Sequence, residues 1–180
     1  REAHLYLADF AGLIRKVLQN SEKEEVSLAE ELEMTEQYLN LEKLRFHFEF
    51  SISLEKTIDA NNTMVPGMLL QPFAENAVIH GLQAKEGNRN LKIEVKKGGG
   101  EEKIEGRGEG LVIWIEDNGI GFCVDKPLNT DTLSFGLFSI SKRIQSQGGD
   151  MEMYSEPGKG TNIILILDIK LKNSREINLC

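Results

Sequence analysis

Short polar or glycine-rich segments interrupt the apolar runs of this chain at four places. In chain order they are residues 71–81, Asp117-Asn118-Gly119-Ile120-Gly121, Ser134-Phe135-Gly136-Leu137 and Gly158-Lys159-Gly160-Thr161. The first of them contains the polar pair Glu75-Asn76 between hydrophobic neighbours. Glycine, carboxylate and carboxamide groups suit places where the backbone must come close to a base or a phosphate. Four such segments in a chain of mixed helix and strand patterns indicate a nucleotide site.

Asp117 follows a strand pattern and could select adenine. A buried carboxylate accepts a hydrogen bond from the exocyclic amine of adenine, and this contact discriminates against guanine. Gly119 and Gly121 would then let the backbone pass beneath the base, where a side chain would clash. The alternative is an ordinary turn, because Asp-Asn-Gly is a common turn sequence.

Asn76 and the segment around Gly136 could bind the phosphate end of a nucleotide. A carboxamide oxygen suits Mg²⁺, which takes few protein ligands when phosphate oxygens supply the rest. The Gly136 segment opens a helical pattern, whose first amides attract phosphate, and Lys142 and Arg143 follow as candidate counter-charges. The alternatives are a capping or water-facing role for Asn76 and a solvated surface position for the two cations.

Apolar residues at helical spacing predict the helices that position these segments. They cover residues 2–19, 28–43, the stretch that carries Asn76, and a stretch that begins near Leu137 and ends at Gln147-Gly148. In the Asn76 helix the apolar stripe is expected to contain Phe73, Ala77 and either Ile79 or His80. Ser27 and Glu30 have the spacing of a capping box at the start of the second helix.

Alternating apolar residues predict strands at residues 46–54, 91–95, 111–116, 151–155 and 161–169. The change from helix to strand at Arg45 indicates a tight corner or a domain boundary. Val65-Pro66 is expected simply to precede the Asn76 helix. The fold class predicted from these elements is α+β.

Composition limits the classes of function that the protein can have. The chain has 180 residues, is 40% hydrophobic and carries a formal charge of −8, which disfavours nucleic acid held by a broad basic surface. It contains no apolar run of the roughly 18 residues that a membrane span needs, and no export signal at residues 1–4. Cys123 and Cys180 form neither a metal motif nor a disulfide framework, so a reducing cytosol is expected. The chain opens inside a helical pattern, which indicates an excised fragment.

Together the motifs resemble the catalytic ATP-binding domain shared by sensor histidine kinases, gyrase, Hsp90 and MutL, and most closely that of the LytS-type sensor histidine kinases. The family's asparagine box, Gln-Pro-Leu-Val-Glu-Asn-Ala-Ile-Lys-His-Gly, is similar to residues 71–81, and its upstream patterns are similar to residues 13–15, 28–32 and 38–46. The resemblance covers residues 3–169. It implies a two-layer α/β sandwich of the Bergerat type, with a mixed, mostly antiparallel sheet covered by helices on one face and preceded by N-terminal helices.

The resemblance also implies a division of the chain and a set of roles. Residues 1–25 would end a dimerisation and phosphotransfer stalk, residues 26–172 would form the ATP-binding domain, and residues 173–180 would be a poorly ordered tail. ATP and Mg²⁺ would be the ligands, with residues 123–133 as a mobile lid. The implied contacts are Asn76 with the metal, Asp117, Gly119 and Gly121 with adenine, Gly136, Leu137 and Arg143 on the phosphate side, and Gly158, Gly160 and Thr161 on the adenine side.

Two residues of the asparagine box are catalytic candidates, Glu75 and His80. Ile79 stands where the family has a lysine, so one phosphate cation is missing and His80 is a candidate to compensate. Glu75 would orient His80 or the metal-bound waters, or else it is a solvated helix residue. Ser134 and Ser139 also depart from the family pattern, at the hinge of the lid.

The implied activity is that of an ATP-dependent protein-histidine kinase of a two-component system. The γ-phosphate would pass to a histidine on a dimeric stalk and then to an aspartate of a response regulator, in the cytoplasmic part of an inner-membrane sensor. The family's Asn-Pro-His-Phe segment is absent here, so this fragment is expected to bind ATP without phosphorylating itself. Pro72 stands where ATP hydrolases and anti-sigma-type serine kinases carry a glutamate base, which disfavours both. A nucleotide-sensing interaction module without transfer activity and an anti-sigma-type serine kinase remain the alternatives.

Overall fold

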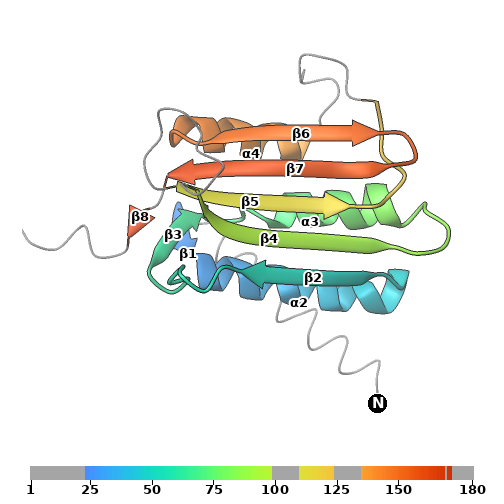
Figure 1. The fold of residues 1–180 in the computed structure, drawn as a ribbon, viewed down its shortest axis with the longest axis horizontal. Coiled ribbons are helices and arrows are strands. Elements are labelled where there is room, and N and C mark those ends of the chain that lie inside the picture. Colours follow the sequence, from blue (N-terminus) through green and yellow to red (C-terminus); the bar gives the residue numbers. More distant parts are fainter. Residues whose placement is uncertain (1–22, 99–109, 124–134, 169, 172–180) are drawn as a thin grey trace, which may run out of the picture.

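The structure is a computed structural model that describes residues 23–98, 110–123, 135–168 and 170–171. A five-stranded sheet lies at its centre, in the order β2-β4-β5-β7-β6 (Figure 1). Its strands are β2 (Glu49–Leu54), β4 (Asn90–Gly98), β5 (Gly110–Asp117), β6 (Asp150–Glu156) and β7 (Gly160–Asp168). β2 pairs in parallel with β4, whereas the other neighbours are antiparallel.

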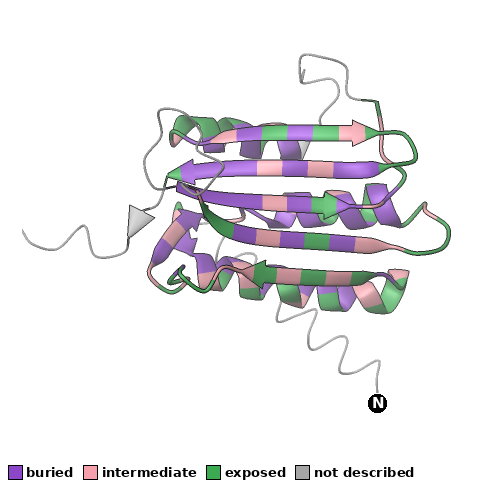
Figure 2. Ribbon diagram, in the orientation of Figure 1, coloured by how far each residue is buried: buried purple, intermediate pink, exposed green. Residues whose placement is uncertain are grey.

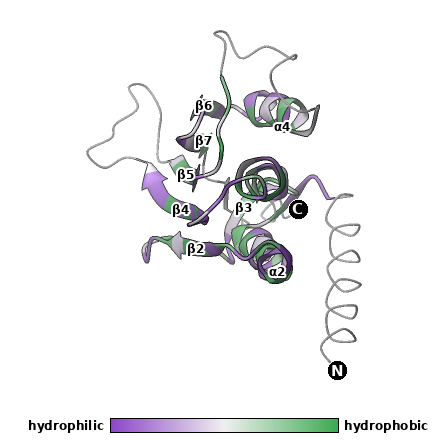
Figure 3. Ribbon diagram, turned by 90° about the vertical axis from the view of Figure 1, so that its right-hand side faces the viewer, coloured by the Kyte–Doolittle hydropathy of each residue, from purple (hydrophilic) through white to green (hydrophobic). Residues whose placement is uncertain are grey.

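Among the described residues, the helices lie on one face of this sheet (Figures 1 and 3). They are α2 (Leu28–Phe46), α3 (Gln71–Glu75), η1 (Asn76–Leu82) and α4 (Phe135–Ser146). Along β4, Leu91, Ile93 and Val95 are buried, while the residues between them are less buried or exposed (Figure 2). Such alternation places one set of side chains between sheet and helices, where burial of apolar surface supplies the main stabilisation. The predicted fold class and sandwich architecture are confirmed.

A smaller sheet was not expected from the sequence. It contains β1 (Glu25–Ser27), β3 (Thr63–Pro66) and β8 (Lys170–Leu171), in the order β1-β3-β8. Val65 and Pro66, predicted only to precede the Asn76 helix, are therefore the end of a strand that pairs with β1. This pairing fixes where the chain enters the turn at residues 67–70 that leads into α3.

α2 begins with the predicted capping box and ends in a tight corner. The Ser27 hydroxyl accepts from the Glu30 amide at 3.2 Å, and the Glu30 carboxylate accepts from the Ser27 amide at 3.0 Å. At the other end His47 adopts the left-handed conformation (φ 53°), and its amide donates to the Lys43 carbonyl. Because the helix continues to Phe46, the following strand starts at Glu49 and not at residue 46 as predicted.

The helix that carries Asn76 differs from the expected α-helix. From Asn76 to Leu82 it has π geometry, with the Gln83 amide donating to the Val78 carbonyl at 2.9 Å. Ile79, 44% exposed, and His80 therefore face away from the core, whereas Val78 and Leu82 are buried. The prediction that Ile79 or His80 completes the apolar stripe was wrong, because a π turn shifts every later side chain around the axis. Single π turns occur often at functional sites.

The other predicted helices and strands agree with the structure where it describes them. α4 ends at a glycine signal, since Gly148 has φ 83° and the Gly149 amide donates to the Ile144 carbonyl at 3.0 Å. The predicted helix at residues 2–19, nearly all of the predicted lid and the C-terminal tail lie outside the described residues.

Candidate functional site

Three segments far apart in the sequence meet at one end of the sheet: the end of η1, the loop after β5, and the turn between β6 and β7. The Ile120 amide donates to the Gly81 carbonyl at 3.0 Å, and the Gly158 amide donates to the Ile120 carbonyl at 2.6 Å. The loop after β5 is thus bonded to the helix on one side and to the β6–β7 turn on the other. Asp117 is the last residue of β5, and its carboxylate lies inside this junction.

Asp117 is 6% exposed, and burial raises the pKa of its carboxyl group to about 6 from an ordinary value of 3.8. The Gly119 amide donates to its Oδ1 at 2.7 Å, and the amide and hydroxyl of the nearby Thr161 also favour the ionised form. These polar groups, and the charge of Lys85, lower the pKa but offset only part of the effect of burial. Above about pH 6 the group is therefore a buried anion with spare acceptor capacity.

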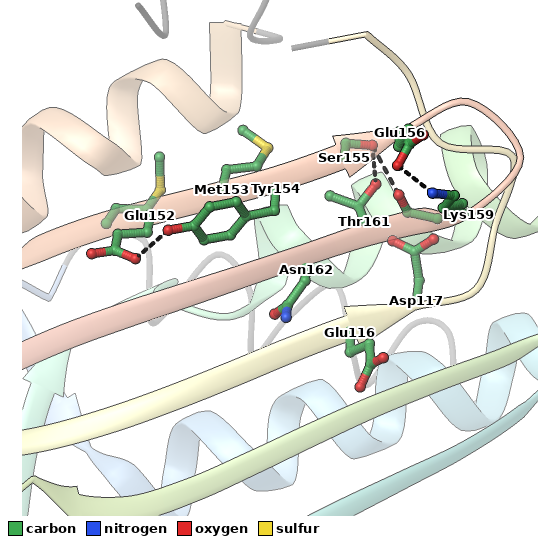
Figure 4. Close-up of a pocket in the computed structure, with 12 residues that line it drawn as sticks. Glu116, Asp117, Glu152, Met153, Tyr154, Ser155, Glu156, Lys159, Thr161 and Asn162 are labelled. Carbon is green, nitrogen blue, oxygen red and sulfur yellow. Dashed lines mark hydrogen bonds and ion pairs between the residues drawn. The ribbon is translucent and has the colours of Figure 1, made fainter. Parts of the chain in front are cut away.

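Ser155 extends this network to the start of the predicted lid. Its hydroxyl accepts from the Phe122 amide at 3.0 Å. It donates its single proton to the Gly160 carbonyl at 3.0 Å and lies 3.0 Å from the Thr161 hydroxyl (Figure 4). Ser155 thus links the backbone at Phe122 to Thr161, whose hydroxyl favours the ionised form of the Asp117 carboxylate. Ser155 was not predicted, because a serine in an alternating strand gives no distinctive signal.

The glycines of the motifs are required by contacts within the protein. A Cβ at Gly119 would lie 2.5 Å from the carbonyl carbon of Gly81, and a Cβ at Gly121 would lie 2.1 Å from the Glu156 oxygen. At Gly160, which has φ 90°, it would lie 2.0 Å from the backbone oxygen of Asp117. Gly158 differs, because an added Cβ would meet nothing within 4 Å, although its φ of 81° also favours glycine.

The turn between β6 and β7 and the end of β5 border a cavity of about 670 Å³. Its wall includes Asp117, Met153, Tyr154, Ser155, Gly160 and Thr161 (Figure 4). Asp117, Gly160 and Thr161 are thereby brought together, and their contact with adenine stays a prediction. Asn76 is not among the residues that line this cavity.

Asn76 instead lies one turn back along the helix that touches Asp117. A Cβ on Gly81, near the end of η1, would lie 2.9 Å from Asp117 Oδ1. Five residues of helix rise by about 7.5 Å at most, so the start of η1 is within one nucleotide length of the carboxylate. Asn76 is half-buried. Its role as a metal ligand stays a prediction.

The two catalytic candidates of this helix are both exposed. Glu75 accepts from the Gln71 amide group at 2.9 Å. Burial raises the pKa of the Tyr38 phenol of α2, and the charges of Glu42 and Glu75 raise it further. His80 and Ile79 point toward solvent near the other end.

The predicted phosphate-side residues Gly136, Leu137 and Arg143 all lie on α4 but in different surroundings. Gly136 lies in the first turn of the helix, where free amides are expected. Leu137 is buried in the core, so only its backbone could meet a phosphate. The Arg143 guanidinium donates to the Gly67 carbonyl, which engages it in packing α4 against the turn before α3. We therefore leave Arg143 out of the proposed nucleotide contacts.

Family comparison supports the interpretation of this geometry. A family model described as Histidine kinase-, DNA gyrase B-, and HSP90-like ATPase matches residues 66–171, more than half of the chain. The chain belongs to this ATPase family. A second model, described as Histidine kinase, matches residues 1–50.

Relatives of this ATPase domain include three bacterial proteins. YwpD of Bacillus subtilis is 32% identical over 79% of the chain and 50% of its own length. The sensor histidine kinase YesM of Bacillus subtilis is 27% identical over 84% of the chain and 26% of its own length. The sensor protein LytS of Staphylococcus saprophyticus is 30% identical over 70% of the chain and 19% of its own length. The chain thus spans half or less of these relatives.

Solved structures show the same fold. The histidine kinase domain of the blue-light activated kinase EL346 from Erythrobacter litoralis superposes with a TM-score of 0.59 at 15% identity, covering 91% of the chain and 75% of that domain. The kinase AdeS of Acinetobacter baumannii also gives 0.59, at 13% identity, covering 91% and 79%. These structures share the fold, and the family models and the sensor kinase relatives connect this ATPase domain with those of histidine kinases. Within the described residues, no helix has both the length and the apolarity for a bilayer span.

Proposed function

We propose that this domain binds Mg²⁺-ATP between the Asp117 junction and the α3–η1 helix, with adenine at Asp117 and the metal ion at Asn76. The observation that carries the proposal is the contact between Gly81 and the Asp117 carboxylate, because it joins the two binding groups through one rigid helix. Gly160 and Thr161, beside Asp117, would complete the adenine side.

The chemistry of Asp117 fits adenine. Its ionised carboxylate accepts hydrogen bonds only, and the Gly119 amide occupies part of its acceptor capacity. The remaining lone pairs can accept from the exocyclic amine of adenine, whereas the carbonyl of guanine would place two acceptors face to face. The buried Asp117 carboxylate has no ion pair among the residues that the structure describes, and a hydrogen-bond donor from the ligand would offset part of the cost of burying its charge.

The residues present also fit a metal ion that is held mainly by phosphate. The described residues contain no group of three histidine, cysteine, aspartate or glutamate side chains that could hold a metal alone. Asn76 would supply one neutral oxygen ligand, and the nucleotide phosphates and water would supply the rest. When bound, Mg²⁺ would neutralise phosphate charge, which an acidic protein of net charge −8 otherwise repels.

The γ-phosphoryl group would be transferred to a histidine in a part of the protein outside this sequence. The bond from the γ-phosphorus to the bridging oxygen breaks, ADP leaves, and a bond forms to a neutral imidazole nitrogen. Imidazole needs no base to become nucleophilic, which agrees with Pro72 at the position of the glutamate base. The phosphoryl group would then pass to an aspartate of a response regulator.

We further propose that the whole protein is a homodimeric sensor whose kinase domain lies on the cytoplasmic side of a membrane, where ATP is available.

The binding step can be tested by calorimetry with Mg²⁺-ATP. We expect saturable binding by the wild type, and loss of most of it in Asn76→Ala and Asp117→Asn. Asn40→Ala, which removes an exposed carboxamide from α2, is the matched control and should bind normally. Equal binding by all four proteins would refute the assignment of the two residues.

For the transfer step, a longer form that includes the upstream region should yield acid-labile phosphohistidine, whereas acid-stable phosphoserine would contradict histidine transfer.

A further inference from the structure

Glu31 is a fully buried carboxylate that the nucleotide chemistry does not use. It lies on α2 with 0% of its surface exposed, and burial raises its pKa to about 7. Its oxygens accept from two backbone amides, that of Met68 at 3.1 Å and that of Leu70 at 2.7 Å. A buried carboxylate is costly, so the groups that it holds in place indicate its purpose.

Those groups belong to the turn that starts the Asn76 helix. Leu70 is the N-cap residue of α3, and no side chain of its own segment caps the helix. Glu31 supplies from another helix an oxygen acceptor for the N-cap amide at the positive end of α3, the bond that an N3 carboxylate makes in a capping box. Met68 in the same turn has φ 58°, a left-handed conformation that is unfavourable for a residue with a side chain. The bond from the Met68 amide to Glu31 helps to hold this conformation.

Arg143 of α4 holds the same turn from the other side. Its guanidinium donates to the Gly67 carbonyl, and its charge stabilises the ionised form of Glu31. Its Nε is buried and has no hydrogen-bond partner among the described residues, so the side chain is fixed mainly by the Gly67 bond and by attraction to Glu31. Residues 67–70 are thus bonded to α2 through a carboxylate and to α4 through a guanidinium.

We propose that Glu31 and Arg143 are positioning residues that together fix the start of the α3–η1 helix and thereby place Asn76 for the metal ion of bound Mg²⁺-nucleotide. This inference rests on the proposed function. The far end of the helix is fixed separately, by the contact of Gly81 with Asp117. Loosening residues 67–70 should therefore disturb Asn76, which lies midway along the helix of residues 71–82, more than the adenine contacts at its far end.

The test separates the two ends of the nucleotide. The affinity for ATP is measured with and without Mg²⁺, and the affinity for adenosine is measured beside it. We expect Glu31→Gln to reduce the gain in ATP affinity that Mg²⁺ gives by about tenfold, as a lost supporting contact of a metal ligand does, and to change adenosine binding by less than about twofold. Arg143→Met should act in the same direction, and the double variant should lose less than the product of the two single losses, because both residues hold one turn.

Glu42→Gln is the matched control. Glu42 is also a buried carboxylate of α2, 6% exposed, but it pairs with Arg45 at 3.0 Å and not with the turn. It should leave the Mg²⁺ gain unchanged. Arg143 is only half-buried, so Arg143→Met keeps the test decisive if Glu31→Gln does not fold.

Equal weakening of adenosine and Mg²⁺-ATP would show a merely structural role and overturn the proposal, and so would an unchanged Mg²⁺ gain in both variants. If Mg²⁺ no longer raises the ATP affinity of Asn76→Ala but still raises that of Glu31→Gln and Arg143→Met, the proposed function stands and this inference is refuted. If the wild type itself gains nothing from Mg²⁺, the metal role of Asn76 falls first, and the inference falls with it.

Discussion

Asp117→Asn is expected to stabilise the protein at neutral pH while it removes nucleotide binding. Burial raises the pKa of Asp117 from 3.8 to about 6, which means that the folded protein holds this proton more tightly than the unfolded chain does. The bound proton therefore contributes stability that is complete below about pH 4 and is lost as the pH rises through 6. An asparagine is uncharged throughout and escapes this loss.

The magnitude follows from the two pKa values. A difference of about 2 between 3.8 and 6 corresponds to about 3 kcal/mol at most, since one pKa unit is about 1.4 kcal/mol. The amide of an asparagine keeps one acceptor for the Gly119 amide but interacts less well with the polar groups of Thr161, so we expect a net gain of about 1–2 kcal/mol above pH 7. The gain should shrink toward zero near pH 4.

Urea unfolding between pH 4 and 8 measures this effect, and the single tryptophan, Trp114 of β5, is a convenient reporter. Glu116→Gln is the control, because Glu116 is the neighbouring residue of β5 but is exposed. It should change the unfolding free energy by less than about 0.5 kcal/mol at every pH. An Asp117→Asn protein that is no more stable than the wild type at pH 8, or a difference that does not vary with pH, would refute the reasoning. Adenosine affinity of the wild type should likewise fall as the pH drops through about 6, because a protonated carboxyl group accepts less well from an amine.

Further predictions concern the junction and the helix. Gly160→Ala should lower the unfolding free energy by more than about 3 kcal/mol, because its Cβ would overlap backbone, whereas Gly158→Ala, with a similar φ but open space, should cost about 1–2 kcal/mol. Ser155→Ala removes the hydroxyl that supports the adenine carboxylate, so the acid limb of adenosine binding should move to higher pH. Ile79→Lys should strengthen Mg²⁺-ATP binding several-fold with little change in thermal stability, since the position is exposed; Leu44→Lys, also exposed, should not.

The sequence by itself determined the elements and the family. Apolar periodicity, the capping box at Ser27 and the glycine signal after α4 are local, and each reports the backbone conformation of its own few residues. The motifs around Asn76 and Asp117 were recognisable because the functional groups stand at fixed spacing within one segment. These parts of the prediction needed no knowledge of distant contacts.

Only the tertiary structure decided how those segments support one another. The short strands β1 and β3 have too few residues to show an alternating pattern. The π geometry that begins at Asn76 turns Ile79 toward solvent, and no residue type in the segment indicates this change of hydrogen bonding. The burial of Glu31 and the engagement of Arg143 depend on residues 31, 67–70 and 143 meeting in space, and Ser155 matters only because it lies beside Thr161 and Phe122. The pattern of apolar residues indicates which face of a helix or strand is buried. The hydrogen-bond partner of a buried polar group depends instead on how elements that are far apart along the chain pack together.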